Sequence, residues 1–358
     1  MEKEESGVVT LLLLQSVFIG VFAGALDVGA NALFLESYGS ELIPRAFMFS
    51  GMAGIVLTSL YSFLQSRTGF RTFAIFNLLF VVLATAALRF GFEITASKKI
   101  VFLLFVMMGP LTIITMLGFW GTAGRFFTLR QGKRLFGIID MGQVLGMILA
   151  FYAVPVLLTF SFRVLDTLLI SLVSVLIALI LQVYIGRRFS FKAPVSAPRE
   201  KKSSGFTGLF RKKYTALMAV FVMLSVITAF FIHYSFLWAT EANYPEGRAA
   251  ASFLGAFMGT LMIFTIVFKS FLYGWLMKTY GLKVALLISP VLVLLLTAGA
   301  SVVGGFFGYS AESASFTLFF LIIALSKLFN KALKDSMEVP SMKILYQSLD
   351  SRERYDIQ

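Results

Sequence analysis

Ten long apolar segments run through this chain of 358 residues, and a basic linker separates the first six from the last four. A stretch of about 18 or more apolar residues predicts a membrane-spanning helix, because a helix satisfies its own backbone hydrogen bonds inside lipid. The sequence therefore predicts an all-α polytopic membrane protein. The expected spans are residues 9–35, 42–65, 71–91, 99–124, 134–158, 164–186, 215–240, 248–277, 282–304 and 314–336.

The order of the segments predicts two helical bundles. Six spans make an N-terminal bundle at 1–186, and four spans make an incomplete C-terminal bundle at 215–344. Residues 187–214 are rich in Lys, Arg, Ser and Pro, which indicates a flexible cytoplasmic linker. We interpret residues 345–358 as a cytoplasmic tail that leads to a further span, so the chain is expected to hold 6+4 spans of a 6+6 arrangement.

The composition excludes several classes of protein. Hydrophobic residues make up 58% of the chain and charged residues only 14%, whereas about a quarter of the residues of a soluble domain are charged. With no cysteine and one histidine, we expect neither a thiolate nor a histidine-based metal site. The sequence also lacks a phosphate-binding Gly-rich loop followed by Lys-Ser/Thr, and it lacks a nucleophile–base pair. We therefore expect no enzyme activity and no cofactor.

The net charge of +13 indicates membrane topology. The cations collect in alternate connections, which is the pattern of positively charged cytoplasmic loops. This pattern predicts that both termini are cytoplasmic, and it argues against nucleic acid as a partner. Besides the linker, the cytoplasmic connections contain Arg67, Arg71, Arg125, Arg130, Lys133, Arg134, Lys278, Lys283, Lys331, Lys334, Lys343, Arg352 and Arg354. The opposite connections contain Arg45, Lys98, Lys99, Arg163 and Arg248.

The connections at 62–71 and 274–283 resemble each other. Both are similar to the loop signature of the major facilitator superfamily, Gly-x-Leu-x-Asp-Arg-x-Gly-Arg-Arg, although its Asp is absent from both. Such a repeat predicts two related halves, and each loop glycine is expected to form a tight left-handed turn. Leu64, Gly69 and Arg71 correspond to Leu276, Gly281 and Lys283. We assign gating and topology roles to Arg67, Gly69, Arg71, Lys133, Arg134, Gly281 and Lys283.

The tenth span carries a stripe of lysines. Its purely apolar run, 316–325, is too short to cross a bilayer, so the helix must continue through Lys327, Lys331 and Lys334. Their spacing of four and then three residues places them on one helix face. Ammonium groups stacked in this way suit an anion with several oxygens, such as a phosphate chain.

An alternative interpretation of this stripe is structural. Lys331 and Lys334 can extend to the headgroups, and Asp335 and Glu338 can neutralise them four residues further on. Lys327 lies deepest, where an ionisable group usually faces a cavity or a partner. Lys327 is therefore the strongest candidate for contact with a substrate.

Three other polar residues lie inside predicted spans. Lys269 lies deep in the eighth span and Asp27 midway along the first, so they either pair with each other or line a path for a substrate. His233 lies in the aromatic stretch 230–236, where a hydrogen-bonded core histidine is favoured over a proton relay. We include all three among the candidate substrate-binding residues.

The tenth span and the tail carry a family resemblance. Leu325-Ser-Lys327, Lys334-x-Ser336, Tyr346 and Leu349-Asp350 resemble the ATP/ADP translocase family of plastids and intracellular bacteria. That family has Leu-Ser-Lys, Lys-Tyr-Ser and Tyr-Ile-Pro-Leu-Asp at similar spacing. The resemblance implies a twelve-span, facilitator-like fold that exchanges nucleotides. Further matches are Ile43-Pro44, Phe119-Trp120, Lys133-Arg134 and Phe136-Gly137.

The chain also departs from that family. Members that exchange ATP for ADP carry Arg-Asp-Thr-Lys-Asp in the first span, where this chain has Ala25-Leu-Asp27-Val-Gly29. The acidic residues of their fourth and seventh spans correspond to Met108 and His233 in this chain. Of the family's charged residues within the spans, only the tenth-span lysines are therefore matched. The resemblance implies a diverged bacterial relative in the inner membrane, and some such relatives carry a C-terminal soluble domain.

Two functions from different classes follow. The leading hypothesis is a secondary transporter that works by alternating access and carries a nucleotide or another phosphorylated organic anion. Lys327 and Lys269 would contact this small anionic substrate, Asp27 would complete the cavity, and membrane lipid would surround the bundle. The alternative is a membrane module without transport activity that anchors or regulates a downstream cytoplasmic domain.

Overall fold

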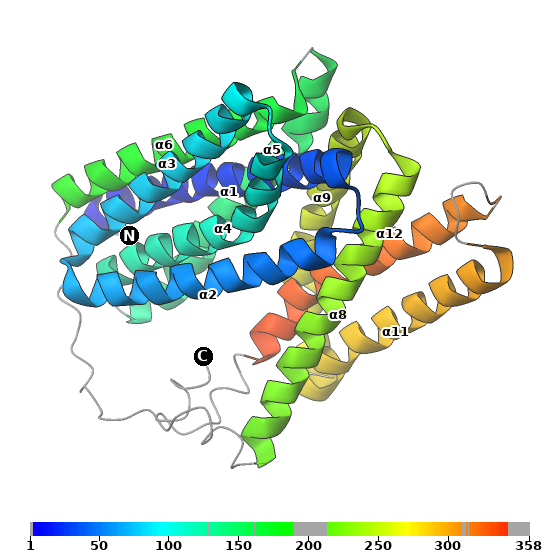
Figure 1. Cartoon of the computed structure of the whole chain (residues 1–358). Coiled ribbons are helices and arrows are strands. Elements are labelled where there is room, and N and C mark those ends of the chain that lie inside the picture. The colour runs from blue at the N-terminus through cyan, green and yellow to red at the C-terminus, as the bar shows by residue number, and fades with distance from the viewer. Residues whose placement is uncertain are drawn as a thin grey trace. The chain divides into compact units, whose positions relative to one another are not determined.

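The computed structural model describes residues 3–127, 129–160, 162–189, 213–308, 313 and 315–342, and all of its regular elements are helices (Figure 1). Most of the predicted linker (190–212) and the whole predicted tail (345–358) lie outside these residues. The elements are α1 (Lys3–Tyr38), α2 (Ile43–Arg67), α3 (Phe70–Thr95), α4 (Lys98–Phe126), α5 (Leu129–Thr159), η1 (Val164–Asp166), α6 (Thr167–Arg188), α8 (Lys213–Asn243), α9 (Gly247–Val267), η2 (Phe268–Leu272), α10 (Tyr273–Thr279), α11 (Gly281–Phe307), α12 (Phe316–Leu333) and η3 (Lys334–Glu338).

The described residues contain ten helical spans that are long and apolar enough to cross a membrane. Their bounds agree closely with the predicted ones, except that the tenth span ends at Met342 instead of residue 336. The predicted continuation of this span through its lysines is therefore confirmed. The prediction of an all-α polytopic fold with about ten spans is confirmed as well.

Contacts divide the chain into two compact units. Unit 1 comprises Met1–Val195 and Tyr244–Thr260, and unit 2 comprises Ser196–Asn243 and Leu261–Gln358. Unit 1 thus holds α1 to α6 and the first part of α9, whereas unit 2 holds α8 and the helices that follow the middle of α9.

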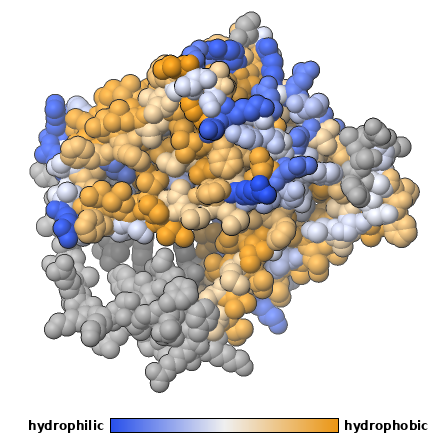
Figure 2. Space-filling view, in the orientation of Figure 1, coloured by the Kyte–Doolittle hydropathy of each residue, from blue (hydrophilic) through white to orange (hydrophobic). Residues whose placement is uncertain are grey.

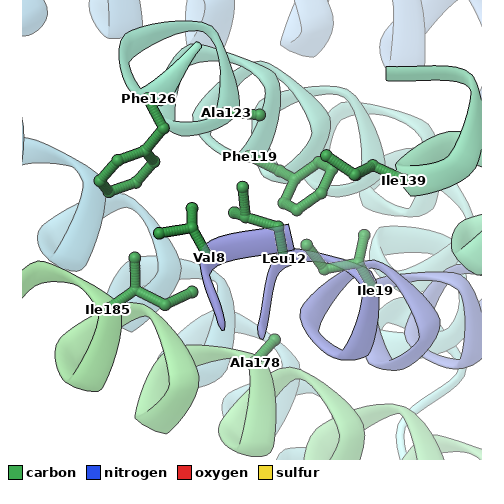
Figure 3. Close-up of a cluster of buried hydrophobic side chains, with 9 residues drawn as sticks. All are labelled: Val8, Leu12, Ile19, Phe119, Ala123, Phe126, Ile139, Ala178 and Ile185. Carbon is green, nitrogen blue, oxygen red and sulfur yellow. The ribbon is translucent and has the colours of Figure 1, made fainter. Parts of the chain in front are cut away.

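Helix α1 forms the centre of unit 1. In its most apolar window 61% of the residues are buried, against 6% in α2, so α1 packs on several helices while α2 lies at the periphery. A buried cluster surrounds its N-terminal half (Figure 3). The cluster consists of Val8, Leu12 and Ile19 from α1, Phe119, Ala123 and Phe126 from α4, Ile139 from α5, and Ala178 and Ile185 from α6.

Glycines allow α1 and α5 to cross in close contact. A Cβ atom built on Gly20 of α1 would lie 2.1 Å from the carbonyl oxygen of Gln143, and one on Gly146 of α5 would lie 2.0 Å from that of Val17. The contact continues at Gly142, where a Cβ would lie 2.2 Å from the Ser16 hydroxyl. Small residues four positions apart let membrane helices approach until their backbones touch. This crossing fixes the position of α1 within unit 1.

A buried chain of polar groups also joins α1 to α6 and α4. Gln15 Nε2 donates to Gln182 Oε1 at 2.9 Å and to the carbonyl of Ala178 at 3.1 Å. Gln182 Nε2 donates in turn to Thr122 Oγ1 at 3.2 Å. These polar side chains are at most 1% exposed. Since a polar group in an apolar medium costs free energy unless it is hydrogen-bonded, the chain helps to set the rotation of the three helices.

The first part of α9 packs on α5 within unit 1. A Cβ atom on Gly255 would lie 2.6 Å from the carbonyl oxygen of Phe151, and one on Gly259 would lie 2.7 Å from the Tyr152 ring. The hydroxyls of Tyr152 and Thr260 are hydrogen-bonded at 2.9 Å. A second pair of glycines four positions apart therefore makes a close helix contact in this unit.

The prediction of left-handed turns at both loop glycines is half right. Gly281, the first residue of α11, has φ +76°, as expected. Gly69, however, has φ −60° and ψ 130°, an extended conformation that any residue adopts. The connection after α2 turns through Thr68 and Gly69 in extended conformation, so it requires no left-handed residue. The predicted left-handed turn at Gly69 is wrong.

Unit 2 contains two interrupted helices. The eighth span changes from α9 to the π-helical turn η2 before α10, and the tenth span changes from α12 to the π-helical turn η3. A π-helical turn holds more residues per turn than an α-helix and is frequent at functional sites. A buried cluster joins the ends of these two spans to the ninth span, and it consists of Leu276 of α10, Ala285 of α11, Leu333 of α12 and Met337 of η3.

Apolar side chains cover much of the described surface. On the face shown in Figure 2, hydrophobic residues predominate and hydrophilic residues gather in a few groups. Met48 and Ile55 of α2 and Phe76 and Leu83 of α3 are each at least 60% exposed. Apolar exposure on this scale is unfavourable in water and is expected of surfaces that face lipid. The chain is a multi-pass membrane protein.

A network of ion pairs joins α3 to η1 at one end of unit 1. Arg89 is 3% exposed and contacts the carboxylates of Glu93 and, at 3.0 Å, Asp166. Arg163 approaches both acids at 3.3 Å. Hydrogen bonds, first with Asp166 and then with Glu93, raise the pKa of the Arg163 guanidinium above its ordinary value.

Replacing Arg89 with methionine should destabilise unit 1 by about 3 kcal/mol, the lower part of the range for breaking a buried ion pair, because Asp166 keeps Arg163 as a partner. The midpoint of thermal unfolding in detergent measures this effect. Replacing Arg163, which is 60% exposed, should change the midpoint much less. Equal effects of the two substitutions would contradict the conclusion that the buried Arg89 contributes more to stability than the exposed Arg163.

Candidate functional site

The lysine stripe of the tenth span lies against α8 in unit 2. Lys327 and Lys331 of α12 both act electrostatically on the imidazole of His233. His233 is half-buried, and its Nδ1 atom is buried. Three candidates from two separate spans are thus brought together, and they form the core of the candidate site.

The two acidic residues of this span have different partners. Lys331 Nζ lies 2.7 Å from Asp335 Oδ2, which is the neutralising pair that the spacing predicts. The corresponding pair of Lys334 and Glu338 is not among the ion pairs of the described residues. Glu338 accepts a hydrogen bond from Ser225 Oγ of α8 instead. Lys334 and Glu338 are the first and last residues of the π-helical turn η3.

An aromatic pocket lies one helical turn from Lys327. It has a volume of about 220 Å³ and is lined by Tyr234, Ser235 and Trp238 of α8 and by Phe319 and Ile323 of α12. The rings of Trp238 and Phe319 meet edge to face, with centroids 6.2 Å apart. Because Ile323 precedes Lys327 by four residues, the pocket and the ammonium group lie on the same face of α12.

The other predicted substrate residues lie elsewhere. Asp27 of α1 is in unit 1, where Asn31 Nδ2 donates to its Oδ1 at 3.2 Å and also approaches the Met108 sulfur of α4 at 3.9 Å. Lys269 is exposed on the π-helical turn η2 of unit 2. Asp27 and Lys269 belong to different units, so their pairing stays a prediction.

Most of the predicted gating residues are exposed around the interhelical connections. Arg67 and Arg71 are exposed in unit 1, and Lys283 is exposed in unit 2. The guanidinium of Arg67 lies 4.5 Å from the centroid of the Phe63 ring. Lys133 and Arg134 belong to the first turns of α5, and their side chains lie outside the described residues.

Arg125, which the sequence predicts only as a loop cation, organises one of these connections. Its guanidinium lies 3.4 Å from the centroid of the Phe70 ring and donates to the carbonyl of Gly121 at 2.9 Å. Phe70 follows Gly69 directly, so Arg125 ties α4 to the turn before α3. The spacing of the loop signature gives no signal for this contact, because the two residues lie in different connections.

The folded chain is thus a polytopic helical membrane protein with a cationic and aromatic site on facing helices of unit 2. No protein-family model matches the sequence, and no curated protein matches it. Among solved structures, its fold is similar to that of a point mutant of the nucleoside transporter NupG, with a TM-score of 0.70 and 15% identity over 98% of this chain and 86% of that one.

A second structure of the NupG nucleoside transporter gives a TM-score of 0.66, and the structure of a bacterial metal transporter gives 0.60, both at 15% identity and over 98% of this chain. The matched region covers 85% of the chain in each of these two structures. At this identity the likeness establishes the fold. The predicted major facilitator-like helical bundle is confirmed.

Proposed function

We propose that this protein is a secondary transporter that works by alternating access and carries a nucleotide or another phosphorylated organic anion. The arrangement that supports this most strongly is the group of Lys327, Lys331 and His233 beside an aromatic pocket in a membrane-embedded unit. Cations inside a membrane protein are costly and usually mark a path for substrate or ions.

The chemistry of the site suits a molecule with an anionic end and a flat ring. Phosphate oxygens accept charge-assisted hydrogen bonds from the ammonium group of Lys327. The rings of Trp238 and Phe319 offer faces and edges on which a base can stack. A volume of about 220 Å³ is below the roughly 300–1,000 Å³ of pockets that enclose a whole drug-sized ligand, so this pocket suits the ring alone.

Two likenesses support the proposal from different sides. Two of the solved structures with this fold are of a nucleoside transporter, which favours recognition of a base. The resemblance of the tenth span to the ATP/ADP translocase family favours a phosphorylated form of such a substrate. The proposal includes a location in a bacterial inner membrane with both termini in the cytoplasm, on the distribution of loop cations.

The test is counterflow in proteoliposomes that contain the complete protein. Vesicles loaded with unlabelled ATP or ADP should accumulate the labelled nucleotide transiently, and protein-free vesicles should not. Excess nucleoside or inorganic pyrophosphate, added separately, would show which end of the substrate the site requires. An absence of counterflow for all phosphorylated substrates, with folded protein, would refute transport and favour the module that anchors or regulates a cytoplasmic domain.

Replacing Trp238 with alanine should raise the KM for nucleotide about tenfold, since an aromatic contact contributes about 0.5–1.5 kcal/mol beyond its buried area. Inhibition by inorganic pyrophosphate should be unchanged, because pyrophosphate has no ring. Trp275 provides the matched control, since it is 53% exposed and contacts Tyr280 instead of the pocket. If the KM for nucleotide and the inhibition constant of pyrophosphate rise equally, Trp238 supports the structure of unit 2 and does not bind the ring of the substrate.

A further inference from the structure

Arginines gather at the end of unit 1 where α2, α4 and α6 end and α3 begins. The arginines of this end are Arg67, Arg71, Arg125, Arg187 and Arg188. None of them belongs to an ion pair among the described residues. At the other end of the same unit, Arg89 and Arg163 are both paired with Glu93 and Asp166. The first end is therefore a group of cations to which the described part of the chain supplies no acid.

Packing between three helices places these arginines. The guanidinium of Arg125 on α4 lies 3.4 Å from the centroid of the Phe70 ring, and Phe70 is the first residue of α3. Arg71 follows it and lies against α6, since a Cβ atom built on Gly186 would lie 3.4 Å from Arg71 Nε. Arg187 follows Gly186 directly. Helices α3, α4 and α6 thus meet through Phe70, Arg71 and Gly186.

Aromatic rings hold several of these guanidinium groups. The guanidinium carbon of Arg67 lies 4.5 Å from the centroid of the Phe63 ring, and that of Arg188 lies 5.8 Å from the centroid of the Tyr184 ring. A guanidinium over the face of a ring keeps most of its N–H donors available, because they point outward in its own plane. Such a planar row of donors matches two oxygens of a phosphate group.

Two further features favour an anion at this end. Helix α3 begins without a capping side chain and without an acidic residue in its first turn, so its free amide groups and its dipole favour a negative charge. Tyr61 of α2 is 8% exposed, and its hydroxyl is buried without a hydrogen-bond partner among the described residues. This hydroxyl lies within electrostatic range of Arg125. An oxygen of a bound anion is the acceptor that it lacks.

Apolar side chains continue from the arginines along the same helices. Phe63 and Leu64 are exposed near the end of α2, and Phe76 is exposed in the second turn of α3. In a membrane protein such side chains contact acyl chains. A phospholipid carries a phosphate and acyl chains in one molecule, so it covers both the cations and the apolar residues. A free phosphate covers the cations alone.

We propose that this end of unit 1 binds the phosphate headgroup of an anionic phospholipid, with Arg71 and Arg125 as its principal contacts. The inference goes beyond the proposed transport function and does not depend on it, because the proposed substrate site belongs to unit 2. Any arginine near a membrane surface attracts anionic lipid. The contacts with Phe70 and Gly186 distinguish a specific site from this general attraction, because they hold the two arginines in place.

Lipid titration of the purified complete protein tests the site. Native mass spectrometry in a neutral detergent counts the bound molecules of phosphatidylglycerol or, in a parallel titration, of phosphatidylcholine. Phosphatidylglycerol should bind more tightly, and Arg71→Gln and Arg125→Gln should each raise its apparent dissociation constant about fivefold. Lys278→Gln is the matched control, since it removes the same charge from an exposed position in unit 2 and should leave this constant unchanged.

Four outcomes would overturn the inference. They are equal binding of the two lipids, an equal loss of binding in Lys278→Gln, unchanged binding in Arg71→Gln, and displacement of the lipid by inorganic phosphate at the same concentration. The last would identify a soluble anion as the ligand, because inorganic phosphate has no acyl chains. Arg71→Gln keeps the test decisive if Arg125→Gln does not fold, since the Arg71 side chain is exposed.

Discussion

Replacing Lys327 with alanine is expected to lower nucleotide counterflow about ten- to a hundred-fold while the protein stays folded. A hydrogen bond to a charged group contributes about 1.5–3 kcal/mol, and each 1.4 kcal/mol is a factor of ten. Lys327 is half-buried on α12, beside the aromatic pocket and His233. Lys331→Ala should have a smaller effect, because Asp335 already pairs with Lys331 at 2.7 Å. Initial rates at equal protein content measure both effects.

Two control variants make this result specific. Lys278→Ala removes an exposed lysine from the same unit, and transport should not change. Lys327→Arg keeps the positive charge and should retain more activity than Lys327→Ala, although the planar guanidinium is not equivalent to an ammonium group. Unchanged kinetics in Lys327→Ala would exclude Lys327 from the substrate site.

Replacing Gly146 with valine is expected to prevent the folding of unit 1. Even a Cβ atom there would lie 2.0 Å from the carbonyl oxygen of Val17 and 3.0 Å from the amide nitrogen of Val21, so α1 and α5 must move apart. Because α1 is the central helix of the unit, its displacement disturbs the packing of α4 and α6 as well. Gly146→Ala should cost about 1–3 kcal/mol, the usual range for overpacking.

Gly137 provides the matched control in the same helix. A Cβ atom on Gly137 would meet nothing within 4 Å, so Gly137→Ala should leave the midpoint of thermal unfolding unchanged or slightly higher. Size-exclusion profiles and thermal unfolding in detergent measure both variants. If Gly146→Ala and Gly137→Ala behave alike, the crossing of α1 and α5 is not as close as described.

The spans were predictable because hydropathy is a local property of the chain. About twenty consecutive apolar residues must form a helix in lipid wherever they lie in the fold, so all ten spans could be predicted from their own residues. The same local argument extended the tenth span through Lys327 and Lys331. The salt bridge from Lys331 to Asp335 also follows from spacing, since both residues lie in one helical stretch.

Contacts between distant residues were not predictable in this way. Gln15 and Gln182 are 167 positions apart, and their polar side chains indicate only that each requires a partner. The glycines of α1 and α5 carry a recognisable spacing of four, which could have indicated a close contact without naming the partner helix. Gly69 and Gly281 occupy matching positions in the repeat, yet only Gly281 has a positive φ, because the surrounding helices set each turn.

The sequence by itself determined the fold class, the number of spans and the residues that carry charge into them, because each depends on the cost of polar groups in lipid. The tertiary structure decided which of these groups meet. It placed His233 within electrostatic range of Lys327 and Lys331, and it made Ser225 the hydrogen-bond partner of Glu338. Such pairings depend on how helices rotate against one another, and this rotation is set by packing between segments distant in the chain.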